Sequence, residues 1–282
     1  MRELRGRVAL VTGGSRGVGP HIARALAREG MNVAVTARTA GPLRETADEL
    51  RLLGVGAAAV VGDLTSADDR RRIVSETEAA LGPIDILVNN AGVVSFVEFS
   101  AQDEDDMRRI LETNVVAPAA LARAVLPGML ARGRGHIVTI GSMAGKKGIA
   151  YEAVYAGTKA AVIEWTGALR MELERTPVGA SVILPVYVAD TGMFAVHGIP
   201  APWLAGSISA GRVASAVVRA IRHDLQEVIV RPTPTRPLLA LNALSPALGT
   251  LIVKAMGVVA VNRRLARIDD GAPAAKEKPA QG

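Results

Sequence analysis

A tyrosine and a lysine stand four residues apart in the segment Tyr155-Ala-Gly-Thr-Lys159. Residues at this spacing share one face of a helix. A phenol is a poor acid or base near pH 7 because its unperturbed pKa is about 10. A nearby ammonium group stabilises the phenolate and lowers that pKa, so the pair is suited to proton transfer at neutral pH. The alternative is an ordinary pair of surface side chains.

A serine and a second tyrosine precede this pair. Ser142 follows an apolar run and stands thirteen residues before Tyr155. At the end of a strand its hydroxyl can donate a hydrogen bond to a substrate carbonyl, whereas the alternative is a local cap. Tyr151 lies one turn before Tyr155, but no lysine stands four residues after it. We therefore assign Tyr151 to the wall of a pocket at most.

A glycine-rich loop stands between the first apolar run and the first amphipathic segment. It reads Thr12-Gly13-Gly14-Ser15-Arg16-Gly17-Val18-Gly19. Glycines let the backbone turn tightly and approach a ligand, and the helix that follows directs its free N–H groups at an anion. Because the loop joins a strand to a helix, we predict that it binds a dinucleotide rather than forming a merely structural turn.

The end of the second strand indicates which dinucleotide is bound. An acidic residue there would bind the adenosine 2′-hydroxyl of NAD, but the segment Val35-Thr36-Ala37-Arg38 has none. Arg38, with Arg16 in the loop, is suited to a 2′-phosphate, because guanidinium groups match phosphate geometry. We predict NADP(H) rather than NAD(H); the alternative is that Arg38 is a solvated loop residue.

Short apolar runs alternate with longer amphipathic segments along the chain. Strands are predicted at 8–12, 32–36, 57–61, 84–88, 136–140, 180–184 and 227–230. Helices are predicted at 21–29, 42–53, 67–81, about 103–114, 117–132 and 151–173. This alternation is typical of βαβ units, and strands that are apolar throughout indicate a sheet covered on both faces. We predict an α/β fold, a Rossmann-like doubly wound parallel sheet in three αβα layers, as a single domain over 1–231.

Composition excludes several other classes of protein. The 282 residues include no cysteine, which excludes a disulfide scaffold and a thiolate metal site. The net charge is +6, but basic residues are spread along the chain and aromatics are only 3%, so we expect no nucleic-acid partner. The acidic run at 103–106 suits a helix N-terminus rather than a metal, and no metal is expected. Without an apolar signal segment at the N-terminus, a cytoplasmic protein is expected.

Taken in order, these motifs resemble those of the single-domain short-chain dehydrogenase/reductase family. The resemblance covers about residues 5–230 and also rests on Asp63-Leu64, Asn89-Asn90-Ala91-Gly92 and Asn114. It implies that Tyr155 is the general acid in ketone reduction and that Ser142 orients the carbonyl. It further implies that Lys159 adjusts Tyr155 and binds the nicotinamide ribose, while Asn114 supports a water chain to Lys159. The hydride would come from the cofactor.

The resemblance also implies a set of cofactor contacts in the loop, after the strands and on the catalytic helix. These are Gly13, Ser15, Arg16, Gly17, Val18, Gly19, Arg38, Asp63, Leu64, Asn90, Ala91, Gly92, Tyr155, Lys159, Pro185 and Val188. Asp63 would lie at the adenine, Asn90 to Gly92 on the adenosine ribose side, and Pro185 and Val188 at the nicotinamide amide. Asn89 is expected to stabilise the sheet instead. A homodimer or homotetramer is expected.

Three positions depart from the family pattern. Val186 follows Pro185 where a glycine is usual, and Asp190 stands in the place of a threonine, with Thr191 after it. Ala117 replaces another usual glycine, which is a small change. The first two departures bear on the orientation of the nicotinamide and on the closure of the substrate loop.

The loop over 191–207 is apolar, which indicates an apolar substrate; the alternative is packing against the body of the protein. Its large side chains are Met193, Phe194, Val196, Ile199, Pro200, Trp203 and Leu204. We expect His197 to be packed or exposed rather than catalytic.

Beyond 231 we predict an apolar helical extension at 232–268 and a disordered tail at 269–282. Lys254 is the only charge between Leu238 and Val261, and Pro246 interrupts this stretch, which favours two short helices. The stretch 238–261 would cover the pocket, pack on the body or in an oligomer, or lie on a membrane surface; one unbroken helix would span a bilayer.

The sequence therefore predicts an NADP(H)-dependent oxidoreductase that interconverts a ketone and a secondary alcohol, with a small-molecule substrate. One alternative keeps the fold but catalyses epimerisation or dehydration. Another is a non-catalytic NADP(H)-binding regulatory or scaffold protein. The presence of Ser142, Tyr155 and Lys159 together favours the enzyme.

Overall fold

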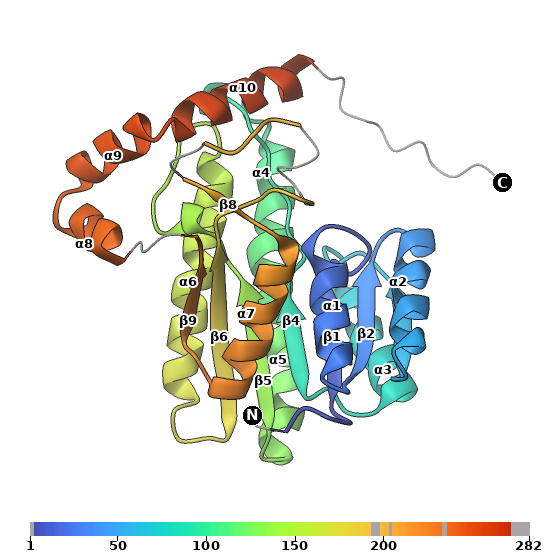
Figure 1. Ribbon diagram of the computed structural model, residues 1–282. Coiled ribbons are helices and arrows are strands. Elements are labelled where there is room, and N and C mark those ends of the chain that lie inside the picture. The colour runs from blue at the N-terminus through green and yellow to red at the C-terminus, as the bar shows by residue number, and fades with distance from the viewer. Residues whose placement is uncertain (1–2, 193–197, 203–204, 233–235, 272–282) are drawn as a thin grey trace.

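A seven-stranded parallel sheet forms the centre of the computed structural model, which describes residues 3–192, 198–202, 205–232 and 236–271 (Figure 1). The strand order is β3-β2-β1-β4-β5-β6-β9, and every neighbouring pair is parallel. The strands are β1 (Val8–Thr12), β2 (Asn32–Ala37), β3 (Ala57–Val61), β4 (Ile86–Asn89), β5 (Gly135–Ile140), β6 (Val178–Pro185) and β9 (Glu227–Val230). The order reverses between β1 and β4, where doubly wound sheets bind their ligands.

Helices cover both faces of the sheet, which explains why its strands are apolar throughout. One core joins the sheet to α1 (Val18–Arg28), α2 (Ala40–Leu52) and α7 (Ala210–His223). The other core joins it to α3 (Ala67–Leu81), α5 (Ala117–Ala131) and α6 (Ala153–Glu172). These layers confirm the predicted Rossmann-like α/β fold.

Most predicted elements occur within a few residues of their predicted bounds. The strands at 8–12, 57–61 and 227–230 and the helix at 67–81 begin and end as predicted. The acidic run starts α4 (Glu104–Leu111), because the Asp103 carboxylate accepts the N–H of Asp106 at 3.0 Å. Helix α7 was not predicted, nor were the two short paired strands β7 (Tyr187–Val188) and β8 (Ser207–Ile208).

From Glu104 to Ala131 the helical backbone is continuous, since the π-helical turn η2 (Glu112–Val116) joins α4 to α5. This 28-residue run is long and apolar enough to cross a membrane by length and composition alone. In this fold its side chains Leu121, Val125 and Met129 are buried against the sheet.

The C-terminal extension forms three helices, α8 (Arg236–Leu244), α9 (Pro246–Ala255) and α10 (Val258–Gly271). The break at Pro246 is confirmed: Ser245 caps α9 and Pro246 is its first residue. The third helix was not predicted, and the division of 238–261 removes the alternative of one unbroken spanning helix. The backbone of α10 continues to Gly271, within the predicted tail, and 272–282 lie outside the described residues.

Candidate active site

The carboxyl end of β5 and the start of α6 bring three of the predicted catalytic residues together. The side chain of Ser142, just beyond β5, hydrogen-bonds the phenol of Tyr155. The Lys159 ammonium lies 5.6 Å from the centre of the Tyr155 ring and donates a hydrogen bond to the carbonyl oxygen of Ile140 at 2.9 Å. One strand end and one helix therefore place a hydroxyl, a phenol and an ammonium at one point.

Local backbone structure fixes this arrangement. Ser142 caps the short helix η3 (Met143–Gly145), and its hydroxyl oxygen accepts the N–H of Ala144 at 3.1 Å. Gly145 packs directly on α6, because a Cβ there would lie 2.5 Å from the backbone carbon of Lys159. A larger residue at 145 would push the Ser142 turn away from the catalytic helix.

Burial governs the electrostatics of the site. Burial and the nearby Glu152 carboxyl raise the pKa of Tyr155 above its ordinary value, and the hydrogen bond with Ser142 lowers it in part. Burial lowers the pKa of Lys159 to about 8. The lowered Tyr155 pKa expected from the sequence is therefore not found in this structure: burial raises it, and the Lys159 ammonium donates its hydrogen bond to the Ile140 carbonyl rather than to the phenol. The phenol stays protonated at neutral pH, as a proton donor requires.

Asn114, the fourth predicted catalytic residue, is buried in the π-helical turn. Its amide nitrogen donates to the carbonyl oxygen of Val93 at 2.9 Å and to the hydroxyl of Thr158 at 3.0 Å. Its oxygen accepts the N–H of Val93 at 2.8 Å. These contacts join the loop after β4 to α6, one residue before Lys159. A place for Asn114 in a proton relay stays a prediction.

The loop after β1 has the shape of a phosphate cradle. Gly13 and Gly17 adopt positive φ angles of 68° and 69°. A Cβ on Gly14 would lie 2.6 Å from that of Val35, and one on Gly19 would overlap the carbonyl oxygen of Gly13. The first turn of α1 holds no acidic side chain, and the residue that precedes the helix, Gly17, has no side chain to cap its backbone N–H groups. The free backbone N–H groups of the first turn of α1 are thus directed at the place where a diphosphate would bind.

Hydrogen bonds join this loop to the end of β4. The Thr12 hydroxyl accepts the backbone N–H groups of Asn90 and Ala91, each at 3.0 Å. The Asn90 amide donates to the carbonyl of Thr12 at 2.8 Å. Asn89 is buried in β4 and donates to the carbonyl of Pro118 at 3.2 Å, so it joins the sheet to α5.

The predicted adenosine contacts follow β2 and β3. Arg16 and Arg38 are exposed, and neither makes an ion pair or hydrogen bond with any residue that the structure describes. The Asp63 carboxylate accepts both the N–H and the hydroxyl of Thr65 at 2.9 Å, while Leu64 packs in the second core. Ser15, Val18 and Gly92 are half-buried beside this edge. The donor set, two unpaired guanidinium groups beside a glycine cradle, fits a phosphorylated dinucleotide.

The departures from the family pattern have structural explanations. Val186 follows the end of β6 at Pro185; its N–H donates to the carbonyl of Val230 at 3.2 Å, and its side chain, like that of Val188, packs on the first core. The Asp190 carboxylate accepts the N–H of Ala210 at 2.9 and 3.2 Å and so caps α7. Of the predicted substrate loop, Met193, Phe194, Val196, His197, Trp203 and Leu204 lie outside the described residues.

Three residues near the site, Glu152, Tyr187 and Asn262, were not predicted from the sequence. Glu152 is 7% exposed, and burial raises its pKa to about 8 although Asn262 hydrogen-bonds its carboxyl. Its charge also raises the pKa of Tyr155 and of Tyr187. A single acidic residue inside the otherwise uncharged run 148–158 was the available signal for Glu152. Nothing in the local sequence indicated its contact with Asn262.

Helix α10 covers this side of the catalytic helix. Leu265 and Ala266 are buried against Phe96, with Tyr151 and Tyr187 partly buried in the same cluster. The Asn262 amide donates to the carbonyl of Ala150 at 3.1 Å. Arg263 donates to the Tyr151 hydroxyl at 2.8 Å. The segment leading into α6 is thus held by the C-terminal extension.

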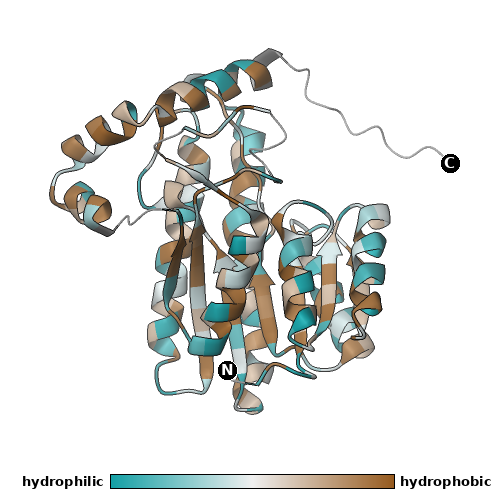
Figure 2. Ribbon diagram, in the orientation of Figure 1, coloured by the Kyte–Doolittle hydropathy of each residue, from teal (hydrophilic) through white to brown (hydrophobic). Residues whose placement is uncertain are grey.

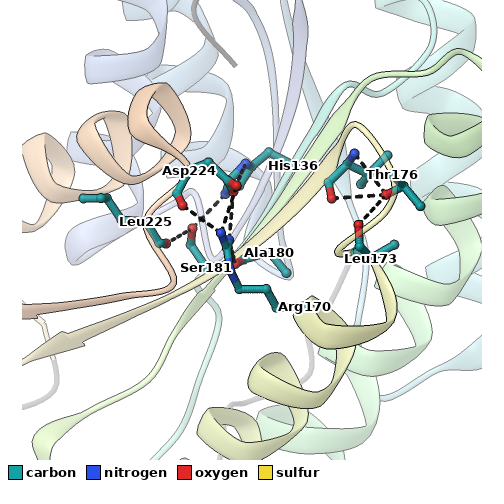
Figure 3. Close-up of polar contacts among 9 residues, drawn as sticks. His136, Arg170, Leu173, Thr176, Ala180, Ser181, Asp224 and Leu225 are labelled. Carbon is teal, nitrogen blue, oxygen red and sulfur yellow. Dashed lines mark hydrogen bonds and ion pairs between the residues drawn. The ribbon is translucent and has the colours of Figure 1, made fainter.

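A second polar cluster lies at the amino end of β5 and β6 (Figure 3). His136 contacts the Ser181 hydroxyl at 2.8 Å and faces Asp224 at 3.9 Å, an order that resembles a nucleophilic triad. Ser181 is fully buried and donates its proton to the carbonyl of Leu225. Arg170 pairs with both carboxylate oxygens of Asp224 at 2.8 Å. The cluster joins α6 to the turn after α7 and is structural, because no substrate can reach the serine.

Among the residues that the structure describes, no three His, Asp or Glu side chains are grouped so that they could hold a metal ion.

Comparison with known proteins gives one consistent family. The family model for short chain dehydrogenase matches residues 7–198. The chain is 40% identical over 278 residues to the ketoacyl reductase HetN of Nostoc sp. strain PCC 7120, covering 96% of this chain and 97% of that protein. The match therefore extends into the C-terminal extension.

Two solved structures resemble the fold closely. A short chain dehydrogenase/reductase from Burkholderia phymatum in complex with NAD has a TM-score of 0.80 and 25% identity, covering 88% of this chain and 96% of that one. An actinorhodin polyketide ketoreductase variant with NADPH has a TM-score of 0.75 and 31% identity, covering 82% of this chain and 98% of that one.

Proposed function

The chain belongs to the short-chain dehydrogenase/reductase family and is an oxidoreductase of CH–OH and keto groups, and on that basis we propose that it reduces a ketone with NADPH. The observation that supports the proposal most strongly is that Ser142, Tyr155 and Lys159 lie together in a fold whose glycine-rich loop after β1 is shaped to bind a phosphate. The predicted catalytic roles are part of this proposal.

Each side chain has a distinct task in the proposed reaction. A bound nicotinamide would supply the hydride. The Ser142 hydroxyl donates a hydrogen bond to the substrate carbonyl and holds it against Tyr155. The Tyr155 phenol, kept protonated by its raised pKa, gives its proton to the carbonyl oxygen as that oxygen gains negative charge. The Lys159 ammonium stabilises the phenolate that remains.

The preference for NADP(H) over NAD(H) rests on Arg16 and Arg38. Their guanidinium groups are exposed beside the cradle and have no carboxylate partner among the described residues. The two structural neighbours described above carry different cofactors, NAD in one and NADPH in the other. The fold alone therefore does not determine which cofactor binds. Thermal unfolding with each of NADPH, NADP, NADH and NAD tests the preference. A larger shift with the phosphorylated pair, abolished by Arg38→Asp, is expected; equal shifts in wild type would contradict it.

For the substrate we propose an apolar molecule with a keto group. The similarity to proteins named ketoacyl reductase and polyketide ketoreductase supports the keto group. The apolar composition of the loop over 191–207 supports the apolar character. We also propose that the protein is a homodimer or homotetramer and that it is located in the cytoplasm.

The test is NADPH-dependent reduction of a panel of ketones and β-keto esters of increasing chain length. We expect turnover that rises with chain length and an alcohol product identified by chromatography. NADPH binding without reduction of any ketone in the panel would favour the alternative of a non-catalytic NADP(H)-binding regulator or scaffold.

A further inference from the structure

Helices α8 and α9 expose apolar side chains at the edge of the molecule. Within residues 237–256 only Gly249 is buried. Leu241, Leu244, Leu248 and Leu251 are 38%, 85%, 38% and 63% exposed. Figure 2 shows brown, hydrophobic segments along both helices where they project beyond the body of the protein. Exposed apolar side chains gathered on two helices that pack on each other are typical of an interaction site.

The two helices form a defined unit rather than a loose segment. They pack on each other at Gly249, where a Cβ would overlap the side chain of Asn242. The Lys147 ammonium donates to the carbonyl of Pro246 at 3.2 Å and to the hydroxyl of Thr250 at 2.9 Å. The exposed leucines are thus presented from a fixed position.

Basic residues outnumber acidic ones around these helices, and the first acids after them, Asp269 and Asp270, stand at the far end of α10. Residues 228–268 contain no Asp or Glu but six basic residues, Arg231, Arg236, Lys254, Arg263, Arg264 and Arg267. The nearest preceding acid, Glu227, is paired with Lys146 at 2.7 Å. Apolar side chains bordered by basic ones are the composition of helices that lie in the interface of a bilayer with anionic lipids.

We propose that α8 and α9 dock on the surface of a membrane that contains anionic lipids, with the four leucines at the boundary of the acyl chains. This goes beyond the proposed reaction and does not depend on it. Pairing of the same face with a second copy is disfavoured, because two-fold symmetry would bring basic segments against each other. Lys147, which binds α9, stands five residues after Ser142, so the docked helices would lie near the catalytic edge of the sheet.

The test is sedimentation of the full chain with vesicles of phosphatidylcholine alone and of phosphatidylcholine with phosphatidylglycerol. The variant Leu244→Ser/Leu251→Ser removes one exposed leucine from each helix. Leu52→Ser is the matched control, because Leu52 is 88% exposed on α2, far along the chain from the extension. Thermal unfolding of both variants without vesicles verifies that the fold is retained.

We expect binding to the anionic vesicles that falls at least about tenfold in the double variant and is unchanged by Leu52→Ser. Raising the salt concentration should weaken it by screening. Absence of binding to the anionic vesicles would overturn the proposal, as would equal binding to both kinds of vesicle. Concentration-dependent self-association that the double variant abolishes, without vesicle binding, would overturn it in favour of a second copy.

Discussion

Replacing Glu152 with glutamine should change how stability depends on pH. The unfolded chain releases the Glu152 proton near the ordinary pKa of 4.5, whereas burial raises the pKa to about 8 in the folded chain. Between these values the folded state holds one proton more than the unfolded state. The free energy of unfolding therefore falls as pH rises, by about 1.4 kcal/mol per unit, and this loss is complete above about pH 8. Glutamine has the same shape and no proton to lose.

The effect of Glu152 on stability is most easily measured between pH 6.5 and pH 8. His136, whose pKa burial lowers to about 4 from 6.5, has the opposite dependence only below that window. Over these 1.5 units the wild type should lose about 2 kcal/mol relative to Glu152→Gln. For a chain of this size that is roughly 4–8 °C in melting temperature.

The assay is thermal unfolding of wild type, Glu152→Gln and the control Glu164→Gln at pH 6.5, 7.2 and 8. Glu164 lies on the same helix but is exposed, so its variant should follow the wild type. Parallel curves for wild type and Glu152→Gln would refute the reasoning, because they would mean that Glu152 is ionised in the folded chain across this range.

Three further substitutions test the fold. His136→Gln should remove a loss of stability between pH 6.5 and pH 4, because the unfolded imidazole takes up a proton that the buried one, with its pKa lowered to about 4, does not; an unchanged acid limb in urea unfolding would contradict this. Arg170→Lys loses the paired bonds to Asp224 and should cost about 1–2 kcal/mol in urea unfolding, against no measurable change for the exposed Arg123→Lys. Leu10→Ala, at a fully buried position in β1, should cost about 2–5 kcal/mol; a loss no larger than that of the exposed Leu52→Ala would contradict the assigned core.

Most of the correct predictions of strands, helices and site residues came from patterns within short stretches of the sequence. The strands are continuous apolar runs, and the glycine loop and the Tyr155–Lys159 pair are contained within a few residues. Parallel sheet geometry then brings Ser142 and Tyr155 together, because both follow the carboxyl end of β5. Such features depend on short sequence distances and on rules that hold for every doubly wound sheet.

The rest depends on contacts between distant segments. Glu152 and Asn262 are separated by about 110 positions, so no spacing could indicate that α10 covers the start of α6. The helix α7 was missed although its buried residues recur every three or four positions; its capping side chain, Asp190, stands twenty residues earlier. The pKa of Tyr155 was predicted in the wrong direction because burial and the nearby Glu152 carboxyl act on it only in the folded chain.

The most direct test of the account is transfer of deuterium from NADPH labelled at C4 to a β-keto ester, followed by mass spectrometry of the alcohol, in wild type and Tyr155→Phe. Wild type should place one deuterium on the new carbinol carbon. The variant should bind NADPH with nearly the same affinity but turn over about 10²–10⁴-fold more slowly, the contribution of a general acid. Equal rates in the two proteins would contradict the assignment of Tyr155 as the proton donor.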